Sequence, residues 1–276
     1  MNRIIKSVKT AFRRIADLKS MPLRLEFLLT DYCNLNCKGC THFSPLAERE
    51  FEPLEMVGRQ MEKLAAVCGD TVKQVYLIGG ETLLYPDLTQ AMDVARRYFH
   101  SQKIYIFTNG LLLPRMSADF WEAARRNDII IAITRYPIKF DYDAAEELCR
   151  TKGVDVEVFA DRSDNEMNFF RFALDPEGRQ NRYITHFKCY NRGCISVAGG
   201  YVYPCSICAC VHNLNRATGT DFQLTDKDRL DVNAITNVRQ IKRLRDLPSD
   251  FCRYCKNPPA RVGHALSQRR KEEWVD

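Results

Sequence analysis

The chain of 276 residues contains twelve cysteines, and the compartment of the protein decides what these thiols do. Lysine and arginine interrupt the apolar residues of positions 1–9, so we expect no signal peptide and a cytoplasmic protein with reduced thiols. Clustered cysteines in a reducing compartment indicate metal or redox chemistry, whereas a secreted chain would use them for disulfides. The sequence therefore directs attention to metal clusters.

Composition and charge exclude several other classes of protein. Hydrophobic residues make up 45% and charged residues 28%, which excludes a disordered or collagen-like chain. The net charge of +6 permits an anionic substrate but is too small for a nucleic-acid-binding surface. No apolar run reaches transmembrane length. Residues 1–22 predict a basic amphipathic helix, which we interpret as packing on the core, with a membrane-surface helix as the alternative.

Strands and helices alternate from residue 23 to residue 160, which predicts a parallel sheet with helices outside it. A sixth strand expected before Cys189 makes the fold an α/β partial (β/α)6 barrel with a small cysteine-rich C-terminal extension. We expect a core domain at 23–188 and an extension at 189–276. The expected strands are 23–30, 74–78, 103–107, 129–134 and 154–159, and the expected helices are 54–67, 88–98, 118–126, 142–150 and 234–247.

Three cysteines follow the first expected strand in a single loop, at Cys33, Cys37 and Cys40. Parallel α/β sheets place their active sites at this carboxyl edge. The loop supplies three thiolates without an evident fourth ligand, which suits a cubane iron–sulfur cluster with one iron left open for a substrate or cofactor. A zinc site or a set of buried thiols is the alternative.

At these residues the sequence resembles the radical S-adenosylmethionine (radical SAM) enzymes, whose motif is Cys-x3-Cys-x2-Cys after the first barrel strand. The resemblance covers roughly residues 23–160. Many members carry an aromatic residue just before the last cysteine, near the adenine of the cofactor. This chain has Gly39 there, so that contact is missing or is made by backbone.

Residues at the ends of the next strands extend the resemblance to the cofactor site. Gly79, Gly80 and Glu81 are similar to the family's Gly-Gly-Glu-Pro segment, with Thr82 in place of proline, and by resemblance they bind the methionine amino group. Asn109 stands in a Thr-Asn-Gly tripeptide common in the family, and a simple turn is its alternative role. Arg135 follows the fourth strand, where members contact ribose or carboxylate, and a surface ion pair is its alternative role.

A second set of cysteines lies near the C-terminal end, at Cys189, Cys205, Cys252 and Cys255. The spacing of the first two around Gly200 resembles the SPASM and twitch extensions of radical SAM enzymes, with a glycine hairpin between them. No cysteine follows Cys255, which favours the shorter twitch form with one auxiliary 4Fe-4S cluster. A zinc knuckle is the alternative, and Cys194 is an alternative ligand to Cys189.

The resemblance implies a 4Fe-4S cluster that reductively cleaves S-adenosyl-L-methionine and a radical that takes a hydrogen atom from a substrate. Only about twenty residues precede the expected barrel, which favours a small molecule, a sugar among them, over a peptide. Oxidation and epimerisation stay open, and the electron donor would be a flavodoxin or ferredoxin. The alternatives are a maturase that modifies a peptide or partner protein and a non-catalytic zinc-ribbon interaction protein.

Five cysteines are left over after the two sets. Cys68 and Cys149 fall in expected helices and are interpreted as small core residues. Cys194, Cys208 and Cys210 flank the expected hairpin. Cys208 and Cys210, which we expect in a short loop after a ligand, are candidate catalytic hydrogen-atom donors, with a buried inert thiol as the alternative.

Overall fold

The computed structural model describes residues 22–159 and 169–276, and the expected N-terminal helix lies outside this range. The first five strands are separated by four helices, as the sequence predicts, with bounds within about two residues of the expected ones. The strands are β1 (Leu23–Thr30), β2 (Val72–Gly79), β3 (Lys103–Thr108), β4 (Ile129–Thr134) and β5 (Asp155–Phe159), and the helices are α2 (Leu54–Cys68), α3 (Leu88–Tyr98), α4 (Ala118–Arg126) and α5 (Tyr142–Thr151).

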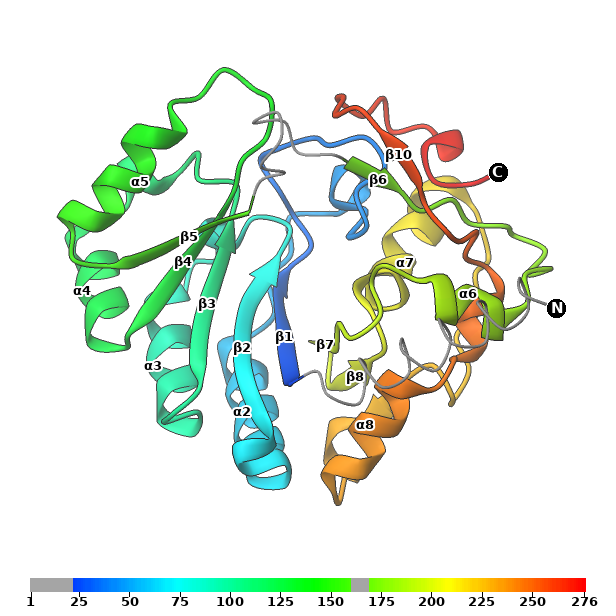
Figure 1. Ribbon diagram of the computed structural model, residues 1–276, viewed down its shortest axis with the longest axis horizontal. Coiled ribbons are helices and arrows are strands. Elements are labelled where there is room, and N and C mark those ends of the chain that lie inside the picture. Colours follow the sequence, from blue (N-terminus) through cyan, green and yellow to red (C-terminus); the bar gives the residue numbers. More distant parts are fainter. Residues whose placement is uncertain (1–21, 160–168) are drawn as a thin grey trace, which may run out of the picture.

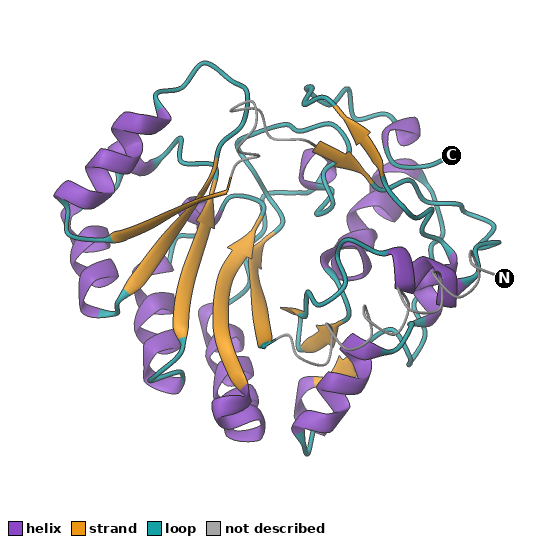
Figure 2. Ribbon diagram, viewed as in Figure 1, coloured by secondary structure: helices purple, strands orange, loops and turns teal. Residues whose placement is uncertain are grey.

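The second half of the chain contributes shorter elements, of which β7, β8 and β9 join the same sheet. They are β6 (Phe169–Arg171), α6 (Arg182–Lys188), β7 (Ser196–Ala198), β8 (Tyr201–Tyr203), α7 (Ser206–Thr218), β9 (Leu230–Asp231), α8 (Val238–Asp246) and β10 (Ala260–Val262). The main sheet has the order β5-β4-β3-β2-β1-β7-β8-β9. Strands β1 to β5 and β7 run parallel, while β8 and β9 are antiparallel. The predicted mixed α/β fold with a mostly parallel, barrel-like sheet is confirmed (Figures 1 and 2).

The sixth parallel strand lies elsewhere than expected. β6 precedes Cys189, but it pairs with β10 in a separate two-stranded sheet. The sixth parallel strand is β7, which follows Cys189 and pairs with β1 on the side away from β2. Side-chain burial explains the difference, because all three residues of β6 stay partly exposed while Val197 of β7 is fully buried. The boundary at residue 189 stays a prediction, although β7 beyond it joins the main sheet.

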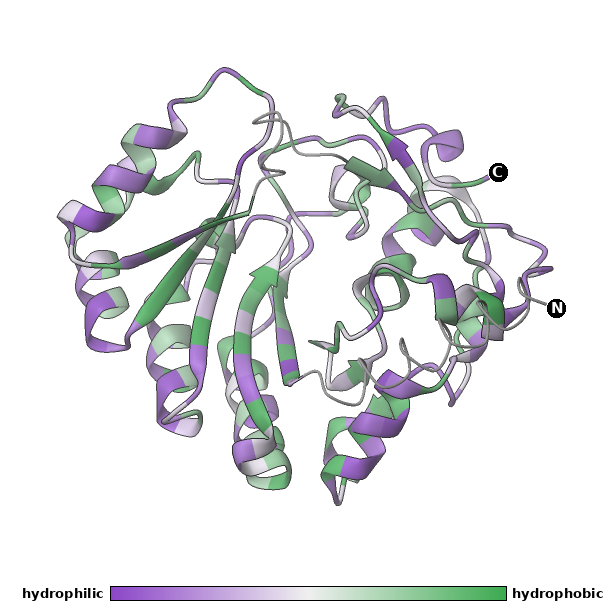
Figure 3. Ribbon diagram, in the orientation of Figure 1, coloured by the Kyte–Doolittle hydropathy of each residue, from purple (hydrophilic) through white to green (hydrophobic). Residues whose placement is uncertain are grey.

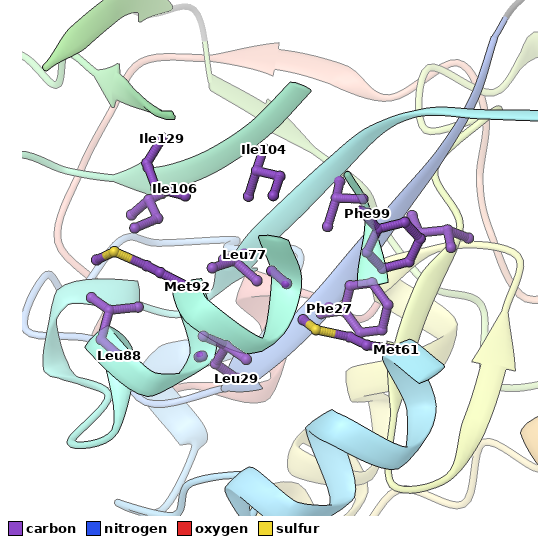
Figure 4. Packing of buried hydrophobic residues seen from close by; sticks show 14 of the residues in the cluster. Phe27, Leu29, Met61, Leu77, Leu88, Met92, Phe99, Ile104, Ile106 and Ile129 are labelled. Atoms are coloured by element: carbon purple, nitrogen blue, oxygen red, sulfur yellow. The ribbon is translucent and has the colours of Figure 1, made fainter. Parts of the chain in front are cut away.

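One face of the sheet carries the main hydrophobic core. Alternate residues of β1, among them Phe27 and Leu29, point toward the helices α2 to α5, because successive side chains of a strand point to opposite faces. They pack against Met61, Met92 and neighbouring strand residues (Figure 4). The outer helices alternate polar and apolar residues as this packing requires (Figure 3). This layer holds the carboxyl ends of β1 to β4 in one row.

Two local features after residue 189 show what a sequence pattern does and does not reveal. The hairpin of β7 and β8 is observed as predicted, with Gly199 and Gly200 both at positive φ (56° and 82°) in the turn. Helix α7 was not expected, since its two asparagines and the threonine at its end favour a loop. Its residues Ile207, Val211 and Leu214 form one buried stripe, and tertiary packing of that stripe overrides the local preference.

The described residues contain no helix that is both long and apolar enough to cross a membrane.

Replacing Leu77 by alanine tests the core beneath the site. Leu77 is fully buried in β2, so the cavity should lower the free energy of unfolding by about 2–5 kcal/mol in a denaturant titration. Leu247→Ala is the matched control, because Leu247 is 49% exposed and the change should stay within about 0.5 kcal/mol. Equal effects of the two substitutions would contradict the packing described here.

Candidate active site

The first cysteine loop begins directly after β1, at the carboxyl edge of the sheet. Cys37 is buried, and Cys33 and Cys40 are partly buried. The Cys40 N–H donates to the Cys37 carbonyl at 3.4 Å, so the loop turns back on itself between these two cysteines. Burial, followed by the thiols of Cys40 and Cys33, raises the pKa of Cys37. Although burial opposes it, the imidazole of His42 lowers the pKa of Cys40. The structure therefore brings the three predicted thiols together.

Gly79 and Gly80 hold the end of β2 against the chain that leads into this loop. The Gly80 N–H donates to the Thr30 carbonyl at 2.7 Å, and the Glu81 N–H donates to the Tyr32 carbonyl at 2.9 Å. A Cβ atom on Gly79 would lie 2.0 Å from the Thr30 carbonyl oxygen, and one on Gly80 would lie 2.2 Å from that of Tyr32. The glycines thus permit two backbones to touch, in addition to any approach to a ligand.

Glu81 is fully buried, and its carboxylate binds the neighbouring strand end. It accepts hydrogen bonds from Thr108 Oγ1 at 2.7 Å, the Asn109 N–H at 2.9 Å and the Leu83 N–H at 3.0 Å. Burial raises the pKa of Glu81, and these three donors counteract the rise. Glu81 therefore fixes the ends of β2 and β3 relative to each other.

Asn109 reaches from the end of β3 to the cysteine loop. Its side-chain N–H donates to Asn34 Oδ1 at 2.8 Å and lies 3.9 Å from Cys33 Sγ. Its Oδ1 accepts the Leu111 N–H, as in an Asx turn. The turn role that the sequence left open is thus observed together with a contact to the loop.

Arg135 is engaged by α5. Its guanidinium forms ion pairs with Glu146 and Asp143 and lies over the ring of Tyr142. This is the ion-pair alternative that the sequence left open, and a contact of Arg135 with the cofactor stays a prediction.

A segment near the end of the chain packs on the first cysteine loop, and the sequence analysis did not foresee it. Trp274 donates its indole N–H to the Cys40 carbonyl at 2.9 Å and packs on Phe43. The His264 Nε2 lies 3.3 Å from Cys37 Sγ. A buried tryptophan in an otherwise charged tail was the available signal, because so large an apolar side chain usually packs on a core.

The second set of cysteines lines a single cavity. Cys189, Cys205 and the closely spaced pair of Cys252 and Cys255 come from three separate parts of the chain. They face it together with Phe172 and Ile207. Burial, followed by the thiols of Cys205, Cys252 and Cys189, raises the pKa of Cys255. The alternative ligand Cys194 accepts a hydrogen bond from Arg24 at 2.9 Å and does not line this cavity. The geometry therefore favours Cys189 for the fourth position.

The thiols of both sets fit iron–sulfur clusters. Within 22–159 and 169–276, no three Cys, His, Asp or Glu side chains converge tightly enough for one metal ion. A cubane cluster needs no such convergence, because each cysteine binds a different iron atom. Four soft thiols around one cavity, and three in one loop at a sheet edge, suit this wider arrangement.

The two candidate donor thiols lie in helix α7 instead of the short loop expected for them. Both are fully buried. The Cys208 thiol lies 3.6 Å from the Asp228 carbonyl, and the Cys210 thiol lies 3.4 Å from Asp31 Oδ1. Asp31 also accepts the Asn213 side-chain N–H at 2.7 Å and so ties α7 to the start of the cysteine loop. A catalytic role for either thiol stays a prediction, and this burial gives it no support.

Comparison with known proteins places the chain in a family. The sequence profile of the radical SAM superfamily matches residues 27–164, which is half of the chain and includes the first cysteine loop. The chain belongs to the radical SAM superfamily. This radical SAM protein is 27% identical to the GTP 3',8-cyclase of Helicobacter pylori (strain 26695) over 113 residues. The matched stretch is 41% of this chain and 33% of that enzyme, so it spans about a third of the relative.

Solved structures extend the similarity of fold to most of the chain. BtrN in complex with AdoMet and 2-DOIA is similar over 92% of this chain and 98% of its own, with 16% identity and a TM-score of 0.53. Native anSMEcpe with bound AdoMet is similar over 82% and 81%, with 13% identity and a TM-score of 0.52. At sequence identities this low, the similarity to these two structures shows the fold alone.

Replacing Gly80 by alanine should remove the contact between the end of β2 and the cysteine loop, because its Cβ would lie 2.2 Å from the Tyr32 carbonyl oxygen. We expect most of the iron of the first set to be lost after anaerobic reconstitution, measured as iron and acid-labile sulfide per chain. Gly58→Ala is the control, since its Cβ would meet Val94 at an ordinary 3.8 Å. Full iron loading of both variants would contradict this role of Gly80.

Proposed function

We propose that this radical SAM protein is an enzyme that binds a 4Fe-4S cluster through Cys33, Cys37 and Cys40 and cleaves S-adenosyl-L-methionine reductively. The convergence of the three thiols at the sheet edge, against the backbone of Gly79 and Gly80, carries the proposal. Three thiolates leave one iron of a cubane without a protein ligand, and that open position is where S-adenosyl-L-methionine would bind. When bound, the cluster and S-adenosyl-L-methionine supply a carbon-centred radical that removes a hydrogen atom from the substrate.

The protein's own part is to position these groups and to keep water away. Glu81 and Asn109 fix the ends of β2 and β3 beside the loop, and backbone N–H and C=O groups there offer contacts to an amino-acid moiety. The C-terminal segment covers the loop through Trp274 and His264. A dry, rigid setting limits quenching of a reactive radical by solvent.

We propose a small polar substrate because of the side chains on the sheet face opposite α2 to α5. Phe107 and Phe159 pack at 5.2 Å between ring centroids, and Phe159 is 40% exposed at the carboxyl edge. On the same face the Tyr105 hydroxyl donates to Glu157 at 3.2 Å, and Arg24 pairs with the buried Glu26 at 3.3 Å. Aromatic rings beside carboxylates and a guanidinium suit a compact molecule with hydroxyl or amino groups, such as a sugar.

The four cysteines of the second cavity hold an auxiliary 4Fe-4S cluster in this proposal, as in a twitch-like extension. The support is that these cysteines, from three separate parts of the chain, line one cavity. Held by these thiols, such a cluster would supply an electron acceptor for an oxidation of the substrate. In an epimerisation it would only stabilise the C-terminal part of the fold. A cytoplasmic flavodoxin or ferredoxin is the electron donor.

Metal analysis tests the two proposed clusters. Replacing Cys33, Cys37 and Cys40 together by alanine should remove about half of the iron, because each set holds its own cluster. Cys68→Ala should keep all of it, since Cys68 is a buried core residue of α2. Loss of all the iron, loss of none, or zinc in place of iron and sulfide would contradict the proposal.

Product analysis tests the cleavage itself. The reduced, cluster-loaded protein should convert S-adenosyl-L-methionine to methionine and 5′-deoxyadenosine even without its substrate, as measured by chromatography. The triple cysteine variant should form no deoxyadenosine, whereas Cys68→Ala should match the wild type. A fully loaded wild-type protein that yields no deoxyadenosine would refute the proposed activity.

A further inference from the structure

The chain beyond the second cysteine set returns to the first cysteine loop and pairs with it through backbone hydrogen bonds. The Lys38 N–H donates to the Ala265 carbonyl at 2.8 Å, and the Ser267 N–H donates to the Asn36 carbonyl at 2.8 Å. These bonds lie on both sides of Cys37 in the sequence, so they fix its backbone against the returning segment. The segment is held at its other end by β10, which pairs with β6.

His264 stands in this segment with its ring locked in place. The ring packs against Tyr136 at 5.4 Å and against Phe169 at 5.7 Å between centroids. Its Nε2 lies 3.3 Å from Cys37 Sγ, well within the distance of a hydrogen bond to sulfur. The side-chain N–H of Asn109 lies 3.9 Å from Cys33 Sγ, so the contact to Cys37 is the shorter of the two.

We propose that His264 is a positioning residue that donates a hydrogen bond from Nε2 to the sulfur of Cys37 and thereby raises the reduction potential of the first cluster. This inference rests on the proposed cluster at Cys33, Cys37 and Cys40. An iron-bound thiolate is an acceptor only, so the facing nitrogen of a neutral imidazole carries the proton. The positive end of the N–H dipole stabilises the reduced cluster, which carries one more negative charge. Because Cys37 is only 5% exposed, water screens this effect little.

Two substitutions of His264 separate the hydrogen bond from the packing of the ring. His264→Phe keeps a ring between Tyr136 and Phe169 but removes the N–H. His264→Gln offers an amide N–H at a similar reach and removes the ring. His100→Phe is the control, because His100 lies between α3 and β3, away from the cysteine loops.

The readouts are iron per chain and the midpoint potential of the first cluster in a redox titration followed by EPR. The signal of this cluster is the one that the Cys33, Cys37 and Cys40 triple variant lacks. We expect the His264→Phe variant to keep its iron. The midpoint potential of its first cluster should be more negative than in the wild type, so that the ratio of reduced to oxidised cluster at a fixed applied potential is several-fold lower. His264→Gln should move back toward the wild type, and His100→Phe should match it.

Pulsed EPR gives a second readout that a merely structural role would not change. In protein labelled with 15N-histidine and measured without S-adenosyl-L-methionine, the reduced cluster should show weak nitrogen couplings from His264 beside Cys37 and from His42 beside Cys40. The His264→Phe variant should lose the His264 coupling and keep that of His42. An unchanged potential in fully loaded His264→Phe would overturn the inference while leaving the proposed function intact. Loss of iron from both His264 variants would also overturn it, since the N–H would then not be the required feature. A wild-type protein without a first cluster would refute both.

Discussion

The contact between the ends of β1 and β2 is the constraint on which the candidate site depends. Gly79 and Gly80 have no side chains, so the backbone of β2 reaches Thr30 and Tyr32 directly. That contact sets where the cysteine loop leaves the sheet. Glu81, the next residue, fixes the end of β3 in turn, because its carboxylate accepts hydrogen bonds from Thr108 and Asn109. Gly79, Gly80 and Glu81 thus hold the ends of β1, β2 and β3 in fixed relative positions.

The sequence revealed those parts of the molecule that are encoded by short patterns. The apolar runs of β1 to β5, the spacing of Cys33, Cys37 and Cys40, and the paired glycines of the β7–β8 hairpin are all local signals. Helix α7 was not predicted because only its stripe of buried apolar residues favours a helix. That stripe can be recognised only once the rest of the fold that buries it is known. The contact of residues 264–274 with the first cysteine loop was not predicted either. It is made largely by backbone hydrogen bonds between distant segments, and such bonds do not require particular residue types.

Polar residues at strand ends illustrate a further limit of sequence reasoning. Glu81, Asn109 and Arg135 were all expected to face a cofactor, yet each also satisfies a partner within the protein. Arg135 pairs with two carboxylates of α5, and Glu81 accepts three hydrogen bonds inside the fold. Buried polar groups must find partners somewhere, and nothing in the spacing of residues tells whether that partner is a ligand or the chain itself.

The pairing of the first cysteine loop with the returning segment has a consequence for the order of biosynthesis. His264 and Cys37 are 227 residues apart in the sequence, so the ribosome makes the loop long before its cover. At roughly 5–20 residues per second the delay is on the order of tens of seconds. During that interval the loop lacks the contacts that residues 264–274 later make with it. Docking of residues 264–274 then covers Cys37 and Cys40, so the cluster proposed above would reach its thiols more easily before this segment docks than afterwards.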